Sequence, residues 1–296
     1  MRKNRLLIIG CGDVLIRALP WLTQRFKVYA TARHTEAAAR LRGLGVIPVL
    51  CDLDQPKSLR RLSGLARWMV YSAPPAPNGE DDLRCKRFIA KMERYTGVDK
   101  SAILTPRHLA YISTSGVYGD CKGEWVDETR PLRAQSARAI RRVAAESSLK
   151  AWARSQKIKL AILRAPGIYA ADRLPTERIM QATPALIHAE DSWSNHIHAD
   201  DLAHAVSLAL FRGKPLRAMN VADDQPHKMG DYFDLVADSI RQPHPPRIKR
   251  SEAPAVLSAS LMSFLNESRR LNNHRLKQDL RLQLKWPDVG QFLANK

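Results

Sequence analysis

Residues 6–15, Leu-Leu-Ile-Ile-Gly-Cys-Gly-Asp-Val-Leu, place an apolar run directly before two glycines and the start of an amphipathic segment. The apolar run predicts a buried β-strand, and residues 13–25 predict the helix that follows. In such a strand–turn–helix the first glycine permits the tight turn, and the second lets the backbone approach a pyrophosphate at the helix N-terminus. The turn therefore predicts a nucleotide site formed by Gly10, Gly12, Asp13 and Val14.

The third glycine of the G-x-G-x-x-G pattern is missing, because Leu15 stands at that position. We expect this leucine to push the helix slightly away from the strands. The alternative interpretation of the whole stretch is a tight strand-to-helix turn that binds no ligand. What favours a nucleotide is the pattern of the chain around it.

Apolar runs and amphipathic segments alternate through the first half of the chain. Strands are predicted at residues 6–9, 27–32, 46–51, 68–72, 108–113 and 159–164, and helices at 13–25, 36–44, 58–65, 81–96 and 138–156. Pro20 predicts a kink in the first helix. This alternation predicts an α/β protein with a Rossmann-type, doubly wound parallel sheet that carries helices on both faces.

Beyond residue 164 the pattern is less regular. Helices are predicted at residues 200–211 and 231–240, a strand at 217–221, a proline-rich basic loop at 242–255 and helical segments within 256–283. Either Asp200 or Asp201 can cap the helix that begins there. We expect residues 1–166 to form a nucleotide-binding domain. Residues 167–296 form a smaller C-terminal substrate region, partly interleaved with the first because the later strand and helix return to it.

The chain is strongly basic. Its 296 residues contain 48 Lys and Arg against 29 Asp and Glu, a formal net charge of +19. A field of this sign attracts nucleotides, phosphorylated substrates, nucleic acid or anionic lipid. The basic residues are scattered rather than gathered with aromatic residues, which argues against nucleic acid as a partner.

Other features of the composition indicate the cellular location of the protein and whether it binds a metal or a membrane. No apolar run approaches the ~20 residues that span a membrane, and the run at residues 6–9 is too short for a signal peptide. The four cysteines form no CxxC pair, and the histidines and carboxylates are too dispersed for a metal site. We therefore expect a cytoplasmic protein with reduced thiols, no bound metal and no membrane partner.

The end of the second predicted strand indicates which cofactor would bind. NAD sites usually hold an acidic residue there for the ribose 2′-hydroxyl, whereas this chain has Arg33, whose guanidinium can pair with a 2′-phosphate. NADP is therefore favoured, with NAD as the alternative. By position, Asp52 and Leu53 would lie near the adenine, and Ser72, Ala73 and Pro74 near the middle of the cofactor. Asp52 can equally be a helix cap.

Several stretches in order resemble the extended short-chain dehydrogenase/reductase superfamily, and specifically its NAD-dependent epimerase/dehydratase family and an atypical bacterial subgroup. They are residues 10–14, 71–75, 112–119, 125–128, 163–169, 197–202 and 220–226. The resemblance implies that Thr114, at the end of the fifth strand, binds the substrate oxygen. It also implies a cofactor contact at Pro166, within the stretch 163–169.

The resemblance fails at the acid–base pair. The family's Tyr-x-x-x-Lys falls on Arg138 and Arg142, counted back from Glu146. An arginine stays protonated and cannot replace the tyrosine as a base, although Arg142 can still hold the ribose or a phosphate. Candidate substitutes are Tyr118, Tyr169, His196 and His198, of which His198 fits a helix cap better. Asp127 and Glu128 are expected to orient a loop.

Three functions remain open, and the third, which the scattered charge does not favour, is association with nucleic acid through the basic surface. The first is an NADP-linked oxidoreductase or epimerase-like enzyme that acts on a small anionic substrate. The second is a non-catalytic NADP(H)-binding sensor or partner protein, which the missing Tyr-x-x-x-Lys pair favours. The chain can be a monomer or a homodimer that pairs through residues 81–96 and 138–156, where the many arginines of the second helix oppose pairing.

Overall fold

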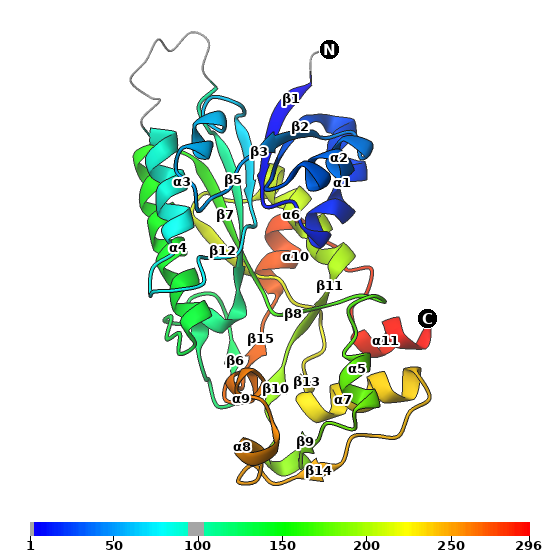
Figure 1. The fold of residues 1–296 in the computed structure, drawn as a ribbon. Coiled ribbons are helices and arrows are strands. Elements are labelled where there is room, and N and C mark those ends of the chain that lie inside the picture. The colour runs from blue at the N-terminus through cyan, green and yellow to red at the C-terminus, as the bar shows by residue number, and fades with distance from the viewer. Residues whose placement is uncertain (1–2, 94–103) are drawn as a thin grey trace.

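Seven parallel strands form the central sheet of the protein (Figure 1). The computed structural model describes residues 3–93 and 104–296. The order across the sheet is β12-β7-β5-β4-β1-β2-β3. The strands are β1 (Asn4–Ile9), β2 (Phe26–Ala32), β3 (Ile47–Leu50), β4 (Trp68–Tyr71), β5 (His108–Thr114), β7 (Lys159–Ala165) and β12 (Arg217–Asn220). The predicted Rossmann-type α/β fold is confirmed.

From β1 the chain adds β2 and β3 on one side of the sheet, and then returns to add β4 and β5 on the other side. The loops that follow β1 and β4 therefore lead to opposite faces of the sheet. Ligands of open α/β sheets bind at such a switch point. The glycine-rich turn that follows β1 lies there. The strand β12 pairs with β7 although it comes late in the chain, so the sheet contains residues beyond 166.

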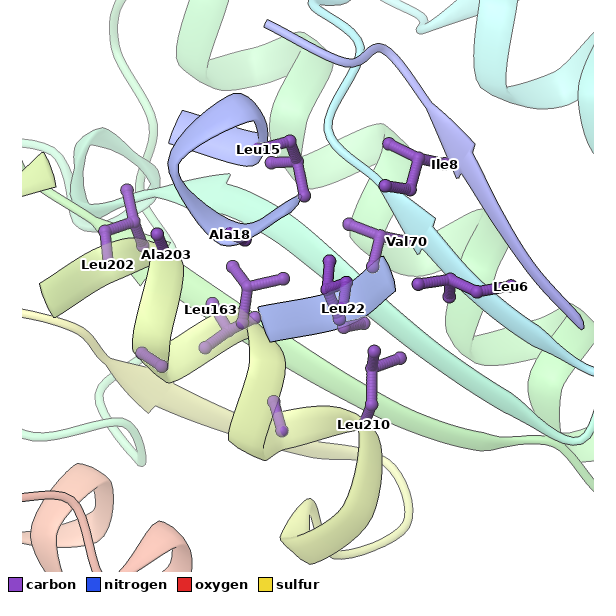
Figure 2. Packing of buried hydrophobic residues seen from close by; sticks show 14 of the residues in the cluster. Leu6, Ile8, Leu15, Ala18, Leu22, Val70, Leu163, Leu202, Ala203 and Leu210 are labelled. Carbon is purple, nitrogen blue, oxygen red and sulfur yellow. The ribbon is translucent and has the colours of Figure 1, made fainter. Parts of the chain in front are cut away.

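One face of the sheet is covered by α1 (Asp13–Arg25), α2 (Thr35–Gly43), α6 (Ala199–Arg212) and α10 (His274–Leu280). Figure 2 shows side chains of α1 and α6 meeting those of the strands, among them Leu15, Ala18, Leu22, Leu202, Leu210, Leu6, Ile8 and Leu163. Each of these side chains is almost completely buried. Burial of a large aliphatic side chain stabilises the fold by about 1.5–3 kcal/mol. This layer therefore holds α1 against the sheet.

The other face is covered by α3 (Leu83–Glu93), α4 (Ala137–Ser155) and a 3₁₀ turn at Ser58–Arg61. Phe88 of α3 packs edge-on against Trp152 of α4, with ring centroids 5.8 Å apart. A buried ion pair fastens α4 to the sheet, since Glu146 accepts hydrogen bonds from Arg164 Nε at 3.1 Å and Nη2 at 2.8 Å. Ser113 Oγ donates a third hydrogen bond to the same carboxylate, at 2.7 Å.

Small elements form the C-terminal region at the carboxyl end of the sheet (Figure 1). Four two-stranded pairs connect them: β8 (Gly167–Tyr169) with β11 (His196–His198), β9 (Ala185–Leu186) with β14 (Arg247–Ile248), β10 (Trp193–Ser194) with β13 (His227–Lys228), and β6 (Trp125–Val126) with β15 (Arg270–Leu271). The helices are α5 (Thr176–Met180), α7 (Met229–Ser239), α8 (Ala253–Val256), α9 (Ala259–Leu265) and α11 (Val289–Ala294).

The helix α1 continues through Pro20, which lies on its exposed side, and the kink there stays a prediction. Other local predictions were wrong. The helix predicted at 58–65 is a short 3₁₀ turn, because Gly64 adopts a φ of 73° and ends the segment. The predicted loop at 242–255 contains β14. The predicted end of the helix 81–96 lies outside the described residues.

The cap of α6 is His198 rather than either aspartate. Its Nδ1 accepts a hydrogen bond from the backbone N–H of Asp200 at 3.2 Å. Asp201 is instead buried and accepts hydrogen bonds from the backbone N–H groups of Lys285 and Trp286. Within residues 3–93 and 104–296, every helix is too short or too polar to cross a bilayer.

Candidate functional site

A cavity of about 910 Å³ lies between the carboxyl end of the sheet and the C-terminal region. The residues that the sequence predicted for the cofactor and for the substrate oxygen all line it, namely Gly10, Gly12, Asp13, Val14, Arg33, Asp52, Leu53, Ser72, Ala73, Pro74, Thr114, Arg142 and Pro166. These residues come from the ends of six different strands, from the first turn of α1 and from α4. The structure thus brings together side chains that are far apart in the sequence, in a space large enough for a dinucleotide and a small second molecule.

The two glycines of the turn have different structural roles. Gly10 has a φ of 85°, and a Cβ there would lie 2.7 Å from Cα of Ala73, so packing alone demands glycine. A Cβ on Gly12 would meet nothing within 4 Å, because this residue faces the cavity. The backbone at Gly12 and the N-terminus of α1 are therefore open to an anionic ligand, as a pyrophosphate site requires.

Leu15 occupies the position of the third glycine. It is 1% exposed and packs in the core between α1 and the sheet, while also lining the cavity. Asp13, the first residue of α1, lies between two arginines. Asp13 Oδ2 lies 3.2 Å from Arg17 Nε and 3.0 Å from Arg173 Nη1. Burial acts to raise the pKa of Asp13, but the hydrogen bonds from these arginines outweigh it and hold the pKa below its usual range.

Basic side chains surround the end of the cavity near β2 and β3. Arg33 follows β2 and is exposed, and Arg40 of α2 lines the same wall. Asp52 accepts a hydrogen bond from the backbone N–H of Asp54 at 2.9 Å, so it caps a turn while also lining the cavity. The position of Asp52 is thus compatible both with a contact to the adenine and with a capping role.

The segment after β4 is fastened to the glycine-rich turn. The hydroxyl of Ser72 donates a hydrogen bond to the carbonyl of Gly10. Arg84, which the sequence analysis did not single out, donates from Nη1 to the carbonyls of Pro74 and Pro75 at 3.2 Å each. The side chain of Ser72 and the carbonyl of Pro74 therefore hold this part of the cavity wall in place.

The two arginines that replace the family's Tyr and Lys are held differently. Arg142 Nη1 donates to Tyr111 Oη at 3.0 Å and to the carbonyl of Ala73 at 3.2 Å. Burial acts to lower the pKa of Arg142, but the contact with Tyr111 outweighs it and the pKa is raised. Arg138 is exposed, and its guanidinium lies 4.7 Å from the ring centroid of Phe264. Both side chains are permanent cations, so neither serves as a base.

Thr114 ends β5 and begins a 3₁₀ turn at Ser115–Tyr118. Its Oγ1 accepts the backbone N–H of Gly116 at 3.2 Å, which leaves the hydroxyl proton available to a ligand. The side chain lines the cavity close to Arg138 and Arg142 of α4. Its position suits a donor to a substrate oxygen.

The other candidate acid–base groups do not fit that role. Tyr118 is buried outside the cavity lining, where it donates to Asn220 at 2.7 Å and accepts from Arg164 at 2.8 Å. Tyr169 is buried outside the lining as well, and burial raises its pKa. His196 does line the cavity, but burial lowers its pKa to about 3 and keeps it neutral. His198 caps α6.

The loop after the fifth strand is structural. Asp127 accepts a hydrogen bond from the backbone N–H of Thr129 at 2.7 Å. Glu128 accepts one from the backbone N–H of Asn220 at 2.8 Å and lies 3.2 Å from Arg275 Nε. Neither carboxylate belongs to the cavity lining. Both contacts agree with the expectation that these residues orient the loop.

Sequence reasoning missed the wall that the C-terminal region supplies. It consists of Arg173, Trp193, Ser194, Met229, Phe264, Glu267 and Arg269. Glu267 and Arg269 form an ion pair of 3.0 Å beside the end of α9. The only sequence signal was an acidic and a basic residue two positions apart in a segment with no regular period. Among the described residues, no group of three or more His, Cys, Asp or Glu side chains could hold a metal ion.

A parallel sheet with a switch point, a glycine-rich turn and a cavity over both define a dinucleotide-binding Rossmann protein. The model of the NAD dependent epimerase/dehydratase family matches residues 12–222. The chain therefore belongs to this family, as the resemblance implied, and the family binds NAD(P).

Solved structures share the fold over nearly the whole chain. A conserved protein of unknown function from Silicibacter pomeroyi is 26% identical, with a TM-score of 0.79 over 99% of this chain and 98% of that one. A suggested NAD-dependent epimerase/dehydratase from Methylobacillus flagellatus is also 26% identical, with a TM-score of 0.71 over 99% and 98%. UDP-glucose 4-epimerase from Thermotoga maritima is similar at 17% identity, with a TM-score of 0.76 over 98% and 96%. Among curated proteins, none matches this chain.

Proposed function

We propose that this protein is an NADP(H)-dependent oxidoreductase or epimerase-like enzyme that acts on a small anionic substrate. The observation that carries the proposal is one continuous cavity, whose lining includes the glycine-rich turn, Thr114 and the aromatic side chains of the C-terminal region. A cofactor alone would not need the second half of this space. Trp193, Met229 and Phe264 offer an apolar surface to a second molecule.

The charge of the lining supports an anionic ligand at both ends. Seven arginines line the cavity: Arg33, Arg40, Arg84, Arg138, Arg142, Arg173 and Arg269. The acidic lining residues are Asp13, Asp52 and Glu267. A concave surface with this excess of positive charge concentrates anions and raises their association rate.

The arginines near β2 support NADP over NAD. Arg33 directly follows the strand at whose end an NAD site usually holds a carboxylate, and Arg40 lies one turn or more along the helix that follows. A guanidinium binds a phosphate through two parallel hydrogen bonds, which are among the stronger polar contacts in proteins. NADH lacks the 2′-phosphate and would leave both arginines without this partner.

Different residues of the cavity would bind different parts of the cofactor and the substrate. The backbone at Gly12 and the first turn of α1 would bind the pyrophosphate, and Arg142, held by Tyr111, would face the nicotinamide ribose or its phosphate. Thr114 would donate a hydrogen bond to the reacting oxygen of the substrate. The bound nicotinamide would supply hydride exchange with the substrate carbon.

A non-catalytic NADP(H)-binding protein is the second candidate, and one observation favours it. Arg138 and Arg142 stand at the positions of the family's acid–base pair, and neither can exchange a proton. This alternative predicts cofactor binding of the same kind but no turnover of any carbonyl or hydroxyl compound.

Calorimetric titration with NADPH and NADH tests the cofactor half of the proposal. We expect NADPH to bind at least ~10-fold more tightly than NADH, since a charge-assisted hydrogen bond contributes about 1.5–3 kcal/mol. Arg33→Ala and Arg40→Ala should each reduce this preference. Arg42→Ala removes an exposed arginine of α2 that does not line the cavity, and it should change nothing.

The outcomes separate the candidates. Equal affinity for both nucleotides, unchanged in the Arg33 and Arg40 variants, would remove NADP specificity from the proposal. Binding of neither nucleotide would overturn it for both candidates. NADPH binding without consumption of NADPH, in the presence of a broad panel of small anionic carbonyl compounds, would favour the non-catalytic protein.

A further inference from the structure

The wall formed by Arg138, Phe264, Glu267 and Arg269, which we term the acidic–basic wall, adjoins Thr114 inside the cavity. We propose that this wall is the substrate subsite and that the substrate is a 2-hydroxy acid or the matching 2-oxo acid. Arg138 pairs with the substrate carboxylate, and Glu267 exchanges the proton of the neighbouring hydroxyl oxygen. The inference rests on the proposed function, because it names the substrate class and the proton carrier of the same site.

Glu267 and Thr114 flank one small space. A Cβ placed on Gly116 would lie 3.6 Å from Glu267 Oε2 and 3.6 Å from Thr114 Oγ1. Because Gly116 has no side chain, the cavity extends into a small pocket beside both a carboxylate and a hydroxyl. A substrate oxygen that enters this pocket has a hydrogen-bond donor and a proton acceptor within reach.

Arg269 fixes the carboxylate of Glu267 in this orientation. The side chain of Glu267 is 8% exposed, and that of Arg269 is 10% exposed. Arg269 Nη1 donates to Glu267 Oε2 at 3.0 Å and to the carbonyl of Gly119 at 2.8 Å. Because Gly119 ends the turn that Thr114 begins, one guanidinium joins Glu267 to the segment that carries Thr114. A positioned carboxylate of this kind is suited to proton exchange.

Arg138 supplies the charge for the substrate. In the part of the chain that the structure describes, no carboxylate lies within ion-pair distance of Arg138; its guanidinium packs on Phe264 instead. The charge of Arg269, the other arginine of the wall, is compensated by Glu267, which accepts a hydrogen bond from its Nη1. One available guanidinium matches one carboxylate, and the nearby charge of Glu267 disfavours a dianionic phosphate.

Phe264 connects Arg138 to Glu267. The guanidinium of Arg138 lies 4.7 Å from the Phe264 ring centroid, and the backbone N–H of Glu267 donates to the carbonyl of Phe264 at 3.2 Å. A carboxylate bonded directly to the reacting carbon can reach Arg138 while its neighbouring oxygen lies between Thr114 and Glu267. Trp193, Met229 and Phe264 leave an apolar surface for the rest of the substrate.

Proton and hydride are both accounted for in this arrangement. In the oxidation of a 2-hydroxy acid, Glu267 would take the hydroxyl proton as the C=O bond forms, and a bound NADP⁺ would accept the hydride from the carbon. In the reverse direction the protonated Glu267 would return the proton to the oxygen, with the hydride supplied by bound NADPH. Water restores the protonation state of Glu267 between turnovers.

The first test measures binding and needs no turnover. Oxamate, which mimics a 2-oxo acid but is not reduced, is titrated into the protein with and without saturating NADPH. We expect Arg138→Ala to weaken oxamate binding by at least ~10-fold, as the loss of a charged hydrogen-bond partner predicts. Glu267→Gln should leave oxamate binding unchanged or tighter. Arg154→Ala, the same change at an exposed position of α4 outside the cavity, is the control.

The second test measures turnover with glyoxylate, pyruvate and phenylpyruvate. Glu267→Gln should reduce kcat by ~100-fold or more, the range of general acid–base catalysis, while NADPH affinity stays the same. Glu267→Asp should retain part of the activity. Gly116→Ala should keep the fold and the NADPH affinity, since its Cβ meets only ordinary contacts, but it should fill the pocket and reduce turnover.

The outcomes distinguish this inference from the function on which it rests. NADPH binding with no detectable oxamate binding would overturn the subsite and leave the cofactor proposal standing. Inorganic phosphate that binds at Arg138 more tightly than oxamate would overturn the carboxylate class. Turnover of a 2-oxo acid that survives Glu267→Gln would overturn the role of Glu267. Failure to bind NADPH would instead refute the proposed function.

Discussion

Asp13 Oδ2 lies 3.0 Å from Nη1 of Arg173, although the two residues are 160 positions apart in the chain. The contact joins the first turn of α1 to the loop that follows β8, and both residues line the cavity. A carboxylate at the N-terminus of α1 is favoured by the helix dipole but would repel a pyrophosphate that binds there. Arg173 compensates this negative charge at the point where it would oppose ligand binding.

Removal of Arg173 should therefore weaken NADPH binding. We expect Arg173→Ala to reduce the affinity about fivefold, corresponding to roughly 1 kcal/mol for a half-exposed ion pair, because Asp13 keeps its second partner Arg17. The double variant Asp13→Asn/Arg173→Ala should recover most of the loss. Calorimetry on the two single variants and the double variant gives the coupling, and independent effects of the two changes would contradict this account.

Substitution of the two glycines of the turn by alanine should affect different properties: stability at Gly10 and NADPH affinity at Gly12. Gly10→Ala forces a Cβ to within 2.7 Å of the backbone at Ala73 at a φ of 85°, so we expect a loss of ~2 kcal/mol or more in the free energy of unfolding. Gly12→Ala should cost about 1 kcal/mol at most, since a Cβ there meets open space. Its effect should appear in NADPH affinity instead.

Urea unfolding and NADPH titration of the same two variants separate these effects. A Gly10→Ala protein as stable as the wild type would show that the turn relaxes easily away from Ala73. A Gly12→Ala protein with full NADPH affinity would show that the ligand does not approach the backbone at this turn.

The ion pair of Glu146 and Arg164 should be the most sensitive polar contact of the sheet. Both side chains are almost completely buried, and Glu146→Gln leaves the Arg164 charge without its partner. We expect a loss of about 3–5 kcal/mol in the free energy of unfolding. Lys150→Ala removes the other cation near Glu146, at 3.5 Å and partly exposed, and should cost about 1 kcal/mol or less. Similar losses in the two variants would contradict the importance of burial.

The sequence predicts the sheet well because its signals are local. Residues 6–15 contain a strand, a turn and the start of a helix in one stretch, and the same unit recurs along the first half of the chain. Thr114, Arg33 and Ser72 could be predicted as site residues for the same reason, since each follows a predicted strand and strand ends of a parallel sheet meet at one edge.

The acidic–basic wall could not be predicted in this way. Glu267 reaches Gly116 only through the path of the C-terminal region, whose paired strands are two or three residues long and carry no measurable period. The sequence suggested Tyr118 and Tyr169 as substitutes because they lie in the stretches that resemble the family. Their hydroxyls instead donate hydrogen bonds inside the protein, to Asn220 and to the carbonyl of Trp286. A carboxylate brought to the site by tertiary structure leaves no spacing that a reader of the sequence can recognise.

His196 should make the stability of the protein depend on pH. Burial lowers its pKa from 6.5 to about 3, so the folded protein keeps this imidazole neutral while the unfolded chain takes up a proton below its own pKa. The free energy of unfolding is therefore not reduced by this group well above pH 6.5, and it decreases as the pH falls from 6.5 toward 3. At about pH 5.5 the wild type should have lost about 1.4 kcal/mol through this group.

The variant His196→Phe isolates that contribution. A phenyl ring preserves the packing against Tyr232, whose ring centroid lies 4.1 Å from that of His196, and it cannot be protonated. The difference in unfolding free energy between variant and wild type, measured in urea from about pH 7.5 to about pH 5.5, should grow in favour of the variant by about 1.4 kcal/mol. His204→Gln, which removes an exposed imidazole of α6, should follow the wild type. A constant difference between His196→Phe and wild type across this range would show that the pKa of His196 is not lowered in the folded protein.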